Sequence, residues 1–294
     1  MIGCDELIYS YGFSIKGKAH EKRDVVCQDS NCIKVLDDNI CIAAVADGLG
    51  SESCSDIASH IACNTAVEFC ANNIEFGMSN KRVLSIVKRS FKKALNQIEK
   101  RVEKENGDIL QYDTTLSLCV LICGRLYYGH SGDSGIIALS DNGYFHKITE
   151  QQRDNEGRVY PLAFGEEYWK FGCFKGRVAG VLLATDGVLE LFYPIYLRFS
   201  EVNMYTSLAR YFLGINHICQ DDFDINLFGD SRRNYVLNIP ESISDDDKTI
   251  VAIIDDNVDV HWQDEEYYKE PDWNLLKEKY KDDYNRKAYL GDNP

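Results

Sequence analysis

The chain has 294 residues, of which 45% are hydrophobic and 27% charged, as in an ordinary globular protein of one or two domains. Its net charge of −15 disfavours a nucleic-acid-binding protein, because such proteins carry a basic face. We expect no membrane association, because no apolar run approaches the roughly 18–20 residues of a membrane helix. The N-terminus lacks the basic-then-apolar pattern of a signal peptide, so we expect a cytoplasmic protein.

Short apolar runs with strand character recur along the chain. The links at residues 124–125 and 141–143 are typical of turns between neighbouring strands, so we expect mostly antiparallel pairing. The predicted strands cover residues 30–36, 39–47, 114–124, 125–133, 134–141, 177–186 and 248–255.

Helical patterns interrupt these runs. One begins near Ser55, and a second follows Ser79 and keeps a 3.6-residue period until Gly107. A less regular, mostly helical stretch lies between Gly187 and Ser244. The predicted fold class is therefore α+β, with helices covering the faces of the sheets.

The C-terminal segment differs in composition from the rest of the chain. Residues 255–294 contain 12 acidic, 6 basic and 7 aromatic residues. We therefore predict a domain at residues 1–255 and an acidic, aromatic, helical tail at residues 256–294. One apolar stripe favours a helix docked on the domain, and the alternative is a partner-binding tail; the stripe contains Trp273, Leu276, Tyr280 and Tyr284.

The chain has 11 cysteines but no CxxC pair and no cysteine–histidine set with zinc spacing. Cys41, Cys119 and Cys123 lie inside apolar runs, where we expect buried, reduced thiols. Cys27 and Cys54 lie beside acidic loops and are the better candidates for reactive thiols.

Five acidic residues stand at the ends of predicted strands. Asp47, Asp133 and Asp186 close strands, whereas Asp29 and Asp246 precede them. In antiparallel neighbours the end of one strand lies beside the start of the next, so these carboxylates can gather at one edge. Clustered carboxylates repel each other, and a hard divalent cation such as Mg²⁺ or Mn²⁺ is the natural compensation.

The glycines beside three of these acids allow a backbone carbonyl to approach a metal ion. The chemistry that follows is metal-assisted hydrolysis, in which two ions about 3.5–4 Å apart activate a water and hold a phosphoryl oxygen. No protein nucleophile is then required. The sequence agrees, because it contains no GxSxG elbow, Walker A motif, HExxH motif or CxxxxxR loop.

Five motifs in order resemble those of the metal-dependent PP2C (PPM) protein phosphatases: VADGLGS, DTTLSLCVLI, GHSGDSG, LLATDGVLEL and DDDKTIVAII. The similarity runs from about Gly12 to Asp255, and the GKAHEKRDVVCQDS stretch is most like bacterial members. The resemblance implies a PP2C-like αββα sandwich of two antiparallel β-sheets flanked by helices. It also implies Mn²⁺ or Mg²⁺ as cofactor, two core ions with a possible third, and removal of phosphate from protein serine and threonine.

The resemblance assigns the metal ligands residue by residue. Asp47 would bridge two metal ions, and the carbonyl of Gly48 would bind one of them. Asp186 and Asp246 would complete the core site. Asp133 would help to bind a third, weaker ion.

The resemblance also implies the catalytic residues. Asp29 would match the acid that orients a metal-bound water. The phosphate-binding arginine of the family lies a few residues before that acid, so Arg23 is the nearest candidate and His20 is the alternative.

The sequence departs from the family pattern at four positions. Leu49 stands where many eukaryotic members have a histidine proposed to protonate the leaving group. Gln28, Asp113 and Gly135 replace a glutamate, a glycine and an arginine, respectively. None of these changes removes a core metal ligand.

Two functions therefore stay open. The leading hypothesis is a metal-dependent protein serine/threonine phosphatase, and the alternative is a catalytically weak or inactive phosphatase-like binding or regulatory module. Retention of all five acids favours catalysis, because a degenerate site has no electrostatic reason to keep repelling carboxylates together. The resemblance implies a phosphorylated protein substrate and a cognate serine/threonine kinase circuit in bacterial signalling, and we expect a monomer.

Overall fold

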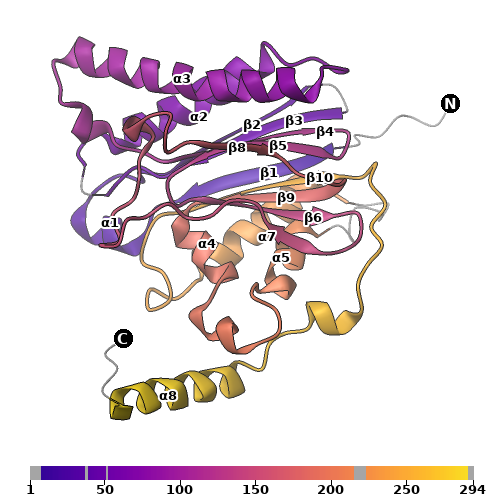
Figure 1. Ribbon diagram of the computed structural model, residues 1–294. Coiled ribbons are helices and arrows are strands. Elements are labelled where there is room, and N and C mark those ends of the chain that lie inside the picture. Colours follow the sequence, from indigo (N-terminus) through magenta and orange to yellow (C-terminus); the bar gives the residue numbers. More distant parts are fainter. Residues whose placement is uncertain (1–7, 37–38, 51, 215–222, 291–294) are drawn as a thin grey trace.

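In the computed structural model, which describes residues 8–36, 39–50, 52–214 and 223–290, two antiparallel five-stranded sheets pack face to face (Figure 1). Their strand orders are β1-β10-β9-β6-β7 and β2-β3-β4-β5-β8. Helices cover the outer face of each sheet. The predicted αββα sandwich is confirmed; Ser51, in the predicted turn after Asp47, lies outside the described residues.

The first sheet contains β1 (Ile8–Ile15), β10 (Lys248–Asp255), β9 (Val178–Ala184), β6 (Gly135–Ser140) and β7 (Phe145–Lys147). The second contains β2 (Ser30–Leu36), β3 (Ile40–Ala46), β4 (Leu116–Ile122), β5 (Arg125–Ser131) and β8 (Lys170–Cys173). All the predicted strands are present. The sequence analysis missed β1, β7 and β8, which are short or interrupted by polar residues.

Side chains alternate between two cores along each central strand. On β3, Ile42 and Ala44 face the outer helices, whereas Cys41, Ala43 and Val45 face the other sheet. This period of two, with both faces buried, explains why β3 is an almost continuous apolar run.

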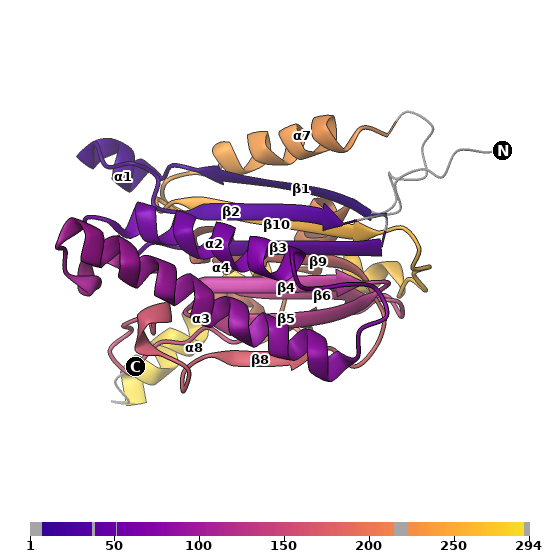
Figure 2. The same ribbon diagram turned by 90° about the horizontal axis from the view of Figure 1, so that it is seen from above.

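The helices form the two outer layers. The second sheet is covered by α2 (Ser55–Ala71) and α3 (Asn80–Glu105), as Figure 2 shows. The first is covered by α4 (Asp186–Phe192), α5 (Thr206–Leu213) and α7 (Ile225–Leu237). A short helix that was not predicted, α1 (Lys18–Arg23), connects β1 to β2.

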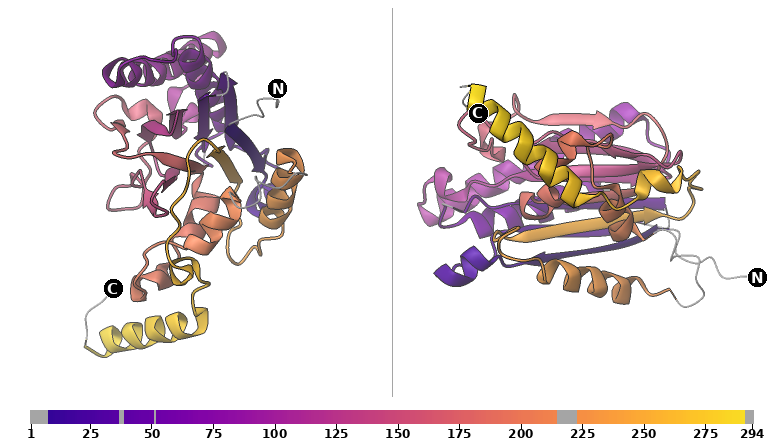
Figure 3. Two further views of the ribbon diagram at one scale, coloured as in Figure 1. Left: turned by 90° about the vertical axis from the view of Figure 1, so that its right-hand side faces the viewer. Right: turned by 90° about the horizontal axis from the view of Figure 1, so that it is seen from below.

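The chain continues after β10 along the first sheet and ends in α8 (Trp273–Leu290), the outermost element in Figure 3. This helix contacts the 3-10 helix η4 (Ile195–Phe199). Tyr280 packs edge-on against Tyr196, with ring centroids 5.3 Å apart, and Arg198 pairs with Asp283 at 3.1 Å. Among the described residues, no helix has the length and apolar character needed to cross a bilayer.

The thiols depart from the prediction at Cys123 and at Cys27. Cys41 and Cys119 are buried, but Cys123 is exposed because it occupies the β4–β5 turn with φ of 47°. Burial, with Asp247 and Asp29 nearby, raises the pKa of Cys27, so this thiol stays protonated and is not activated.

Gly17 provides a test of how tightly the N-terminal segment packs against the segment before β10. A Cβ at Gly17 would lie 2.2 Å from the backbone carbonyl carbon of Asp246, so the backbone would have to shift to relieve the clash. We predict that Gly17→Ala lowers the free energy of unfolding by about 1–3 kcal/mol, measured by urea denaturation. Gly107→Ala is the control, because the atom nearest to its Cβ would be on the ring edge of Tyr112, at 3.3 Å. Equal losses in both variants would contradict this packing.

Candidate metal centre

Three strands deliver carboxylates to the same edge of the sandwich. Asp47 follows β3, Asp133 follows β5, and Asp186 begins α4 directly after β9. Oxygen atoms of these three side chains all lie within 4.8 Å of one another. The predicted gathering of acids at one sheet edge is therefore present in the structure for these three residues.

The backbone around Asp47 is fixed by the threonine pair that directly precedes β4. Thr115 Oγ1 accepts a hydrogen bond from the Asp47 amide at 2.8 Å, and Thr114 Oγ1 donates to the Asp47 carbonyl at 3.0 Å. A Cβ on the next residue, Gly48, would lie 2.6 Å from the carbonyl oxygen of Ser55, so only glycine fits there. These contacts hold the Asp47–Gly48 turn rigidly at the sheet edge.

Asp29 lies in the same buried region. Its Oδ2 accepts a hydrogen bond of 2.7 Å from Thr185, the residue before Asp186. Burial raises the pKa of Asp29 well above its ordinary value, and the nearby charge of Asp247 raises it further. Asp29 is therefore electrostatically linked to the acidic cluster, which the sequence analysis expected.

Two adjacent aspartates before β10 have different surroundings. Asp246 accepts from the amide of the next residue at 2.8 Å, and its charge contributes to the raised pKa of Asp47 and Asp186. Asp247 instead points toward the N-terminal segment, where it accepts from the amides of Gly17 and Gln28, both at 2.6 Å. The role of Asp247 was not predicted. It lies in a run of three aspartates at residues 245–247, and nothing in that run distinguishes a structural acid from a metal ligand.

The two predicted phosphate-binding residues differ in position. His20 is buried, and its Nδ1 lies 2.9 Å from Oδ2 of Asp247. Arg23 is exposed, and its Nε donates to the carbonyl of Ala19 on its own helix at 3.2 Å. The structure thus brings His20 to the buried Asp247 and leaves Arg23 on the surface; the catalytic role of either stays a prediction.

The cluster carries a large electrostatic cost. Burial raises the pKa of Asp47 well above its ordinary value, and the charges of Asp29, Asp186 and Asp133 raise it further. Burial, with Asp133 and Asp246 nearby, raises the pKa of Asp186 to about 7. Without a compensating cation, the cluster therefore retains protons near neutral pH.

Arg153 supplies part of that compensation, and the sequence analysis missed it. Its Nε donates to Asp133 at 2.9 Å, and a terminal nitrogen donates to Asp186 at 3.0 Å. Arg153 lies in the loop between β7 and β8, whose path cannot be read from sequence spacing, so no pattern indicated this contact.

The residues present fit a hard divalent cation. Every candidate donor is a carboxylate or carbonyl oxygen, which Mg²⁺ and Mn²⁺ prefer. In addition, Oδ1 of Asp133 is buried and has no hydrogen-bond partner within the described part of the chain. A buried, unpaired carboxylate oxygen is costly unless a cation completes it.

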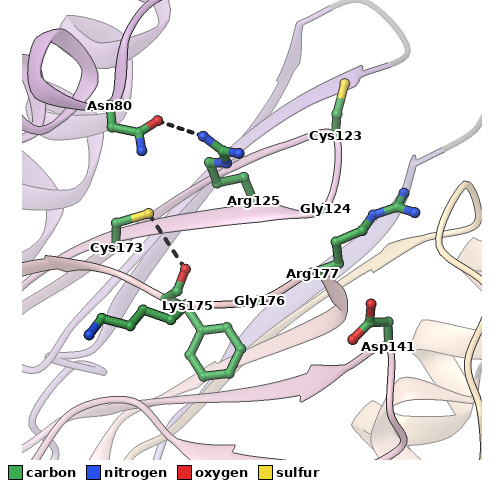
Figure 4. A pocket seen from close by; sticks show the side chains of 10 residues that line it. Asn80, Cys123, Gly124, Arg125, Asp141, Cys173, Lys175, Gly176 and Arg177 are labelled. Atoms are coloured by element: carbon green, nitrogen blue, oxygen red, sulfur yellow. Dashed lines mark hydrogen bonds between the residues drawn. The ribbon is translucent and has the colours of Figure 1, made fainter.

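Two cavities lie at opposite ends of the sandwich. A groove of about 910 Å³ begins at Asp186 and Asp246 and runs toward α8. A cavity of about 760 Å³ lies at the other strand ends (Figure 4). The cationic ends of its Arg125, Lys175 and Arg177 point in different directions, so this cavity is not a convergent anion site.

The family model for protein phosphatase 2C matches residues 16–215, more than half of the chain. The chain belongs to the protein phosphatase 2C family. This assignment identifies it as a protein serine/threonine phosphatase, in agreement with the resemblance seen in the motifs. No curated protein matches it in sequence.

Solved structures of three bacterial proteins, two of them described as serine/threonine phosphatases, share the fold. The Mycobacterium tuberculosis serine/threonine phosphatase PstP is 17% identical, with a TM-score of 0.56, over 84% of this chain and 98% of its own. The Staphylococcus aureus serine/threonine phosphatase Stp1 is 13% identical, with a TM-score of 0.55, over 83% and 94%. Pseudomonas aeruginosa PppA is 14% identical, with a TM-score of 0.56, over 84% and 97%. At these identities the likeness shows the fold alone.

The raised pKa of Asp186 predicts how stability depends on pH. In the metal-free folded protein Asp186 holds a proton up to about pH 7, whereas the unfolded chain releases it near its ordinary pKa of 3.8. The folded state binds more protons between these values, so stability falls as the pH rises through this window. We predict that the Tm in EDTA falls by several degrees from about pH 5 to about pH 7.5. Differential scanning fluorimetry at a series of pH values measures this change in Tm.

Asp186→Asn is the matched variant for this experiment, because it removes one of the titrating carboxyl groups and should make the fall of the Tm in EDTA shallower. Saturating Mn²⁺ should also abolish the fall in the parent protein, because a bound cation favours the ionised carboxylates. A Tm in EDTA that does not change with pH would contradict the electrostatic description of the cluster.

Arg153→Met tests the internal cation. The change removes the charge that faces Asp133 and Asp186, so we predict that the EDTA-treated protein loses about 1–2 kcal/mol of stability. This value is below that of a fully buried pair, because the Arg153 side chain is 35% exposed. Saturating Mn²⁺ should restore most of the loss. Arg158→Met, at a side chain 71% exposed, is the control, and equal losses in both variants would be inconsistent with the prediction.

Proposed function

We propose that the chain hydrolyses phosphoserine and phosphothreonine in proteins with the help of bound Mn²⁺ or Mg²⁺. The observation that carries this proposal is the convergence of three carboxylates within 4.8 Å at the edge of a phosphatase fold. The proposed ligands are Asp47, the carbonyl of Gly48, Asp133, Asp186 and Asp246.

Bound at these residues, the ions would supply an activated water and would polarise the phosphoryl group, so that no protein nucleophile would be required. The protein's own contribution is to hold the donor groups in place. The threonine hydroxyls fix the Asp47 turn, and Thr185 fixes Asp29 beside the cluster. We propose that Asp29 orients the attacking water, because it is a buried acid bonded to the residue that precedes Asp186.

His20 is the better supported of the two phosphate-binding candidates. Its Nδ1 pairs with Asp247, and its Nε2 lies 3.5 Å from the position that a Cβ on Gly50 would occupy. The imidazole is therefore packed against the loop that carries Asp47 and Leu49. Arg23 stays the alternative, since a long exposed side chain can change its rotamer at little cost.

The second candidate function is a phosphatase-like binding or regulatory module with weak or no turnover. Arg153 is the observation that favours it, because a guanidinium between Asp133 and Asp186 offsets part of their charge without a metal ion. Leu49 also favours this second function, because it stands where many eukaryotic family members have a proposed proton donor. Calorimetric titration with Mn²⁺ discriminates the two, since a binding module need not bind the ion.

A kinase-linked signalling role is part of the proposal. The relatives named above are described as serine/threonine phosphatases, and PppA as a regulatory component of a secretion system. Such enzymes act opposite a kinase on the same phosphoprotein. The cytoplasmic location and monomeric state of this chain stay predictions.

The function can be tested with p-nitrophenyl phosphate and a phosphothreonine peptide in Mn²⁺. We predict that Asp47→Asn and Asp246→Asn each lower kcat/KM by about a hundredfold or more, since each removes a charged ligand of the proposed ions. EDTA should abolish turnover. Asp256→Asn, at an exposed acid beyond the end of β10, should retain full activity. Unchanged rates in Asp47→Asn or in EDTA would exclude the proposed function.

A further inference from the structure

The groove beside the metal centre has an apolar, aromatic lining that catalysis does not require. It begins at the acids Asp186 and Asp246 and ends at Trp273 and Lys277 of α8. Between these ends it is lined by side chains of η4 and its neighbours, among them Tyr193, Ile195, Tyr196, Tyr205 and Ile243. Figure 1 shows how α4 and the segment after it separate the first sheet from α8.

Several of these side chains are exposed although they are apolar. Ile195 is 54% exposed and Ile243 is 63% exposed, in a chain with a net charge of −15. Adjacent apolar side chains that stay in water at the margin of a reactive site are typical of a binding surface.

The near end of the groove also carries acids that are not proposed metal ligands. Glu190 and Asp245 line it there. Their charges favour a substrate with positive charge close to the phosphorylated residue.

The wall formed by α8 is fixed to the domain by specific contacts. Trp273 packs edge-on against Tyr205, with ring centroids 4.9 Å apart, and its Nε1 donates to Glu270 at 2.6 Å. The hydroxyl of Tyr205 donates to the same carboxylate at 2.5 Å. The far end of the groove is therefore preformed rather than assembled by a ligand.

Continuity with the metal centre identifies the occupant. A phosphorylated side chain placed at Asp186 and Asp246 brings its neighbouring residues to the groove mouth, and an extended chain advances about 3.3–3.6 Å per residue. We propose that this groove binds the segment of the phosphoprotein substrate beside the phosphorylated residue, and selects an aromatic or branched aliphatic side chain there. This proposal rests on the proposed phosphatase function.

The test uses nonapeptides with a central phosphothreonine in an alanine and lysine background, with one tryptophan moved through the other positions. We expect the full-length protein to prefer at least one tryptophan position about tenfold in kcat/KM over the peptide without tryptophan. Ile243→Asp should remove this preference, because it places a charge in the apolar lining. Its activity on p-nitrophenyl phosphate, which has no flanking residues, should stay unchanged.

Leu227→Asp is the matched control. Leu227 is 68% exposed on α7 and does not line the groove, so this variant should retain the preference. A parent protein without positional preference, or an Ile243→Asp variant that retains it, would overturn the proposal.

A binding measurement separates this proposal from the phosphatase function. Anisotropy of the fluorescein-labelled tryptophan peptides reports the affinity of the groove whether or not the protein turns them over. Positional preference in binding that Ile243→Asp removes would support the groove even if no phosphate were released. Equal affinity for all peptides would exclude it even if p-nitrophenyl phosphate were hydrolysed.

Discussion

Repulsion among buried carboxylates at one end of the sandwich is the constraint on which the site depends. The edge where β3, β5 and β9 end holds Asp47, Asp133 and Asp186, and burial weakens the screening of their charges. The surrounding structure is arranged to tolerate this repulsion. Hydroxyl and amide donors hold the loops, and Arg153 places a positive charge between two of the acids. A protein that keeps such a cluster needs a cation to complete it.

The sequence predicted much of the fold because burial on both faces leaves a clear signal. Strands such as β3 are continuous apolar runs, and α3 keeps its period over seven turns. By contrast, β1 contains serine, tyrosine and glycine among its apolar residues, and its pairing with β10 joins segments more than 200 residues apart. Pairing at such a distance is decided by tertiary contacts, which local propensity does not describe.

The acidic residues of the site could be predicted, because their positions at strand ends decide which side chains come together. Acids at corresponding strand ends must meet, and that argument placed Asp47, Asp133 and Asp186 together. The position of Arg153 beside these acids could not be predicted in this way, because the loop that carries it has no periodic pattern. Nor could strand position decide between Arg23 and His20, since the choice depends on which side chain faces Asp247. Long side chains in irregular segments are placed by packing rather than by spacing.

The contacts of Asp247 have a consequence for how the protein is made. This single carboxylate binds the amides of Gly17 and Gln28 and the ring of His20, so it joins the first described strand–loop segment to the last strand. Those partners are synthesised more than 200 residues before it. A nascent chain therefore cannot form these contacts until Asp247 has left the ribosome, and loop closure at that distance is slow. A product truncated before Asp246 would lack both the carboxylate that makes these contacts and the proposed ligand beside it.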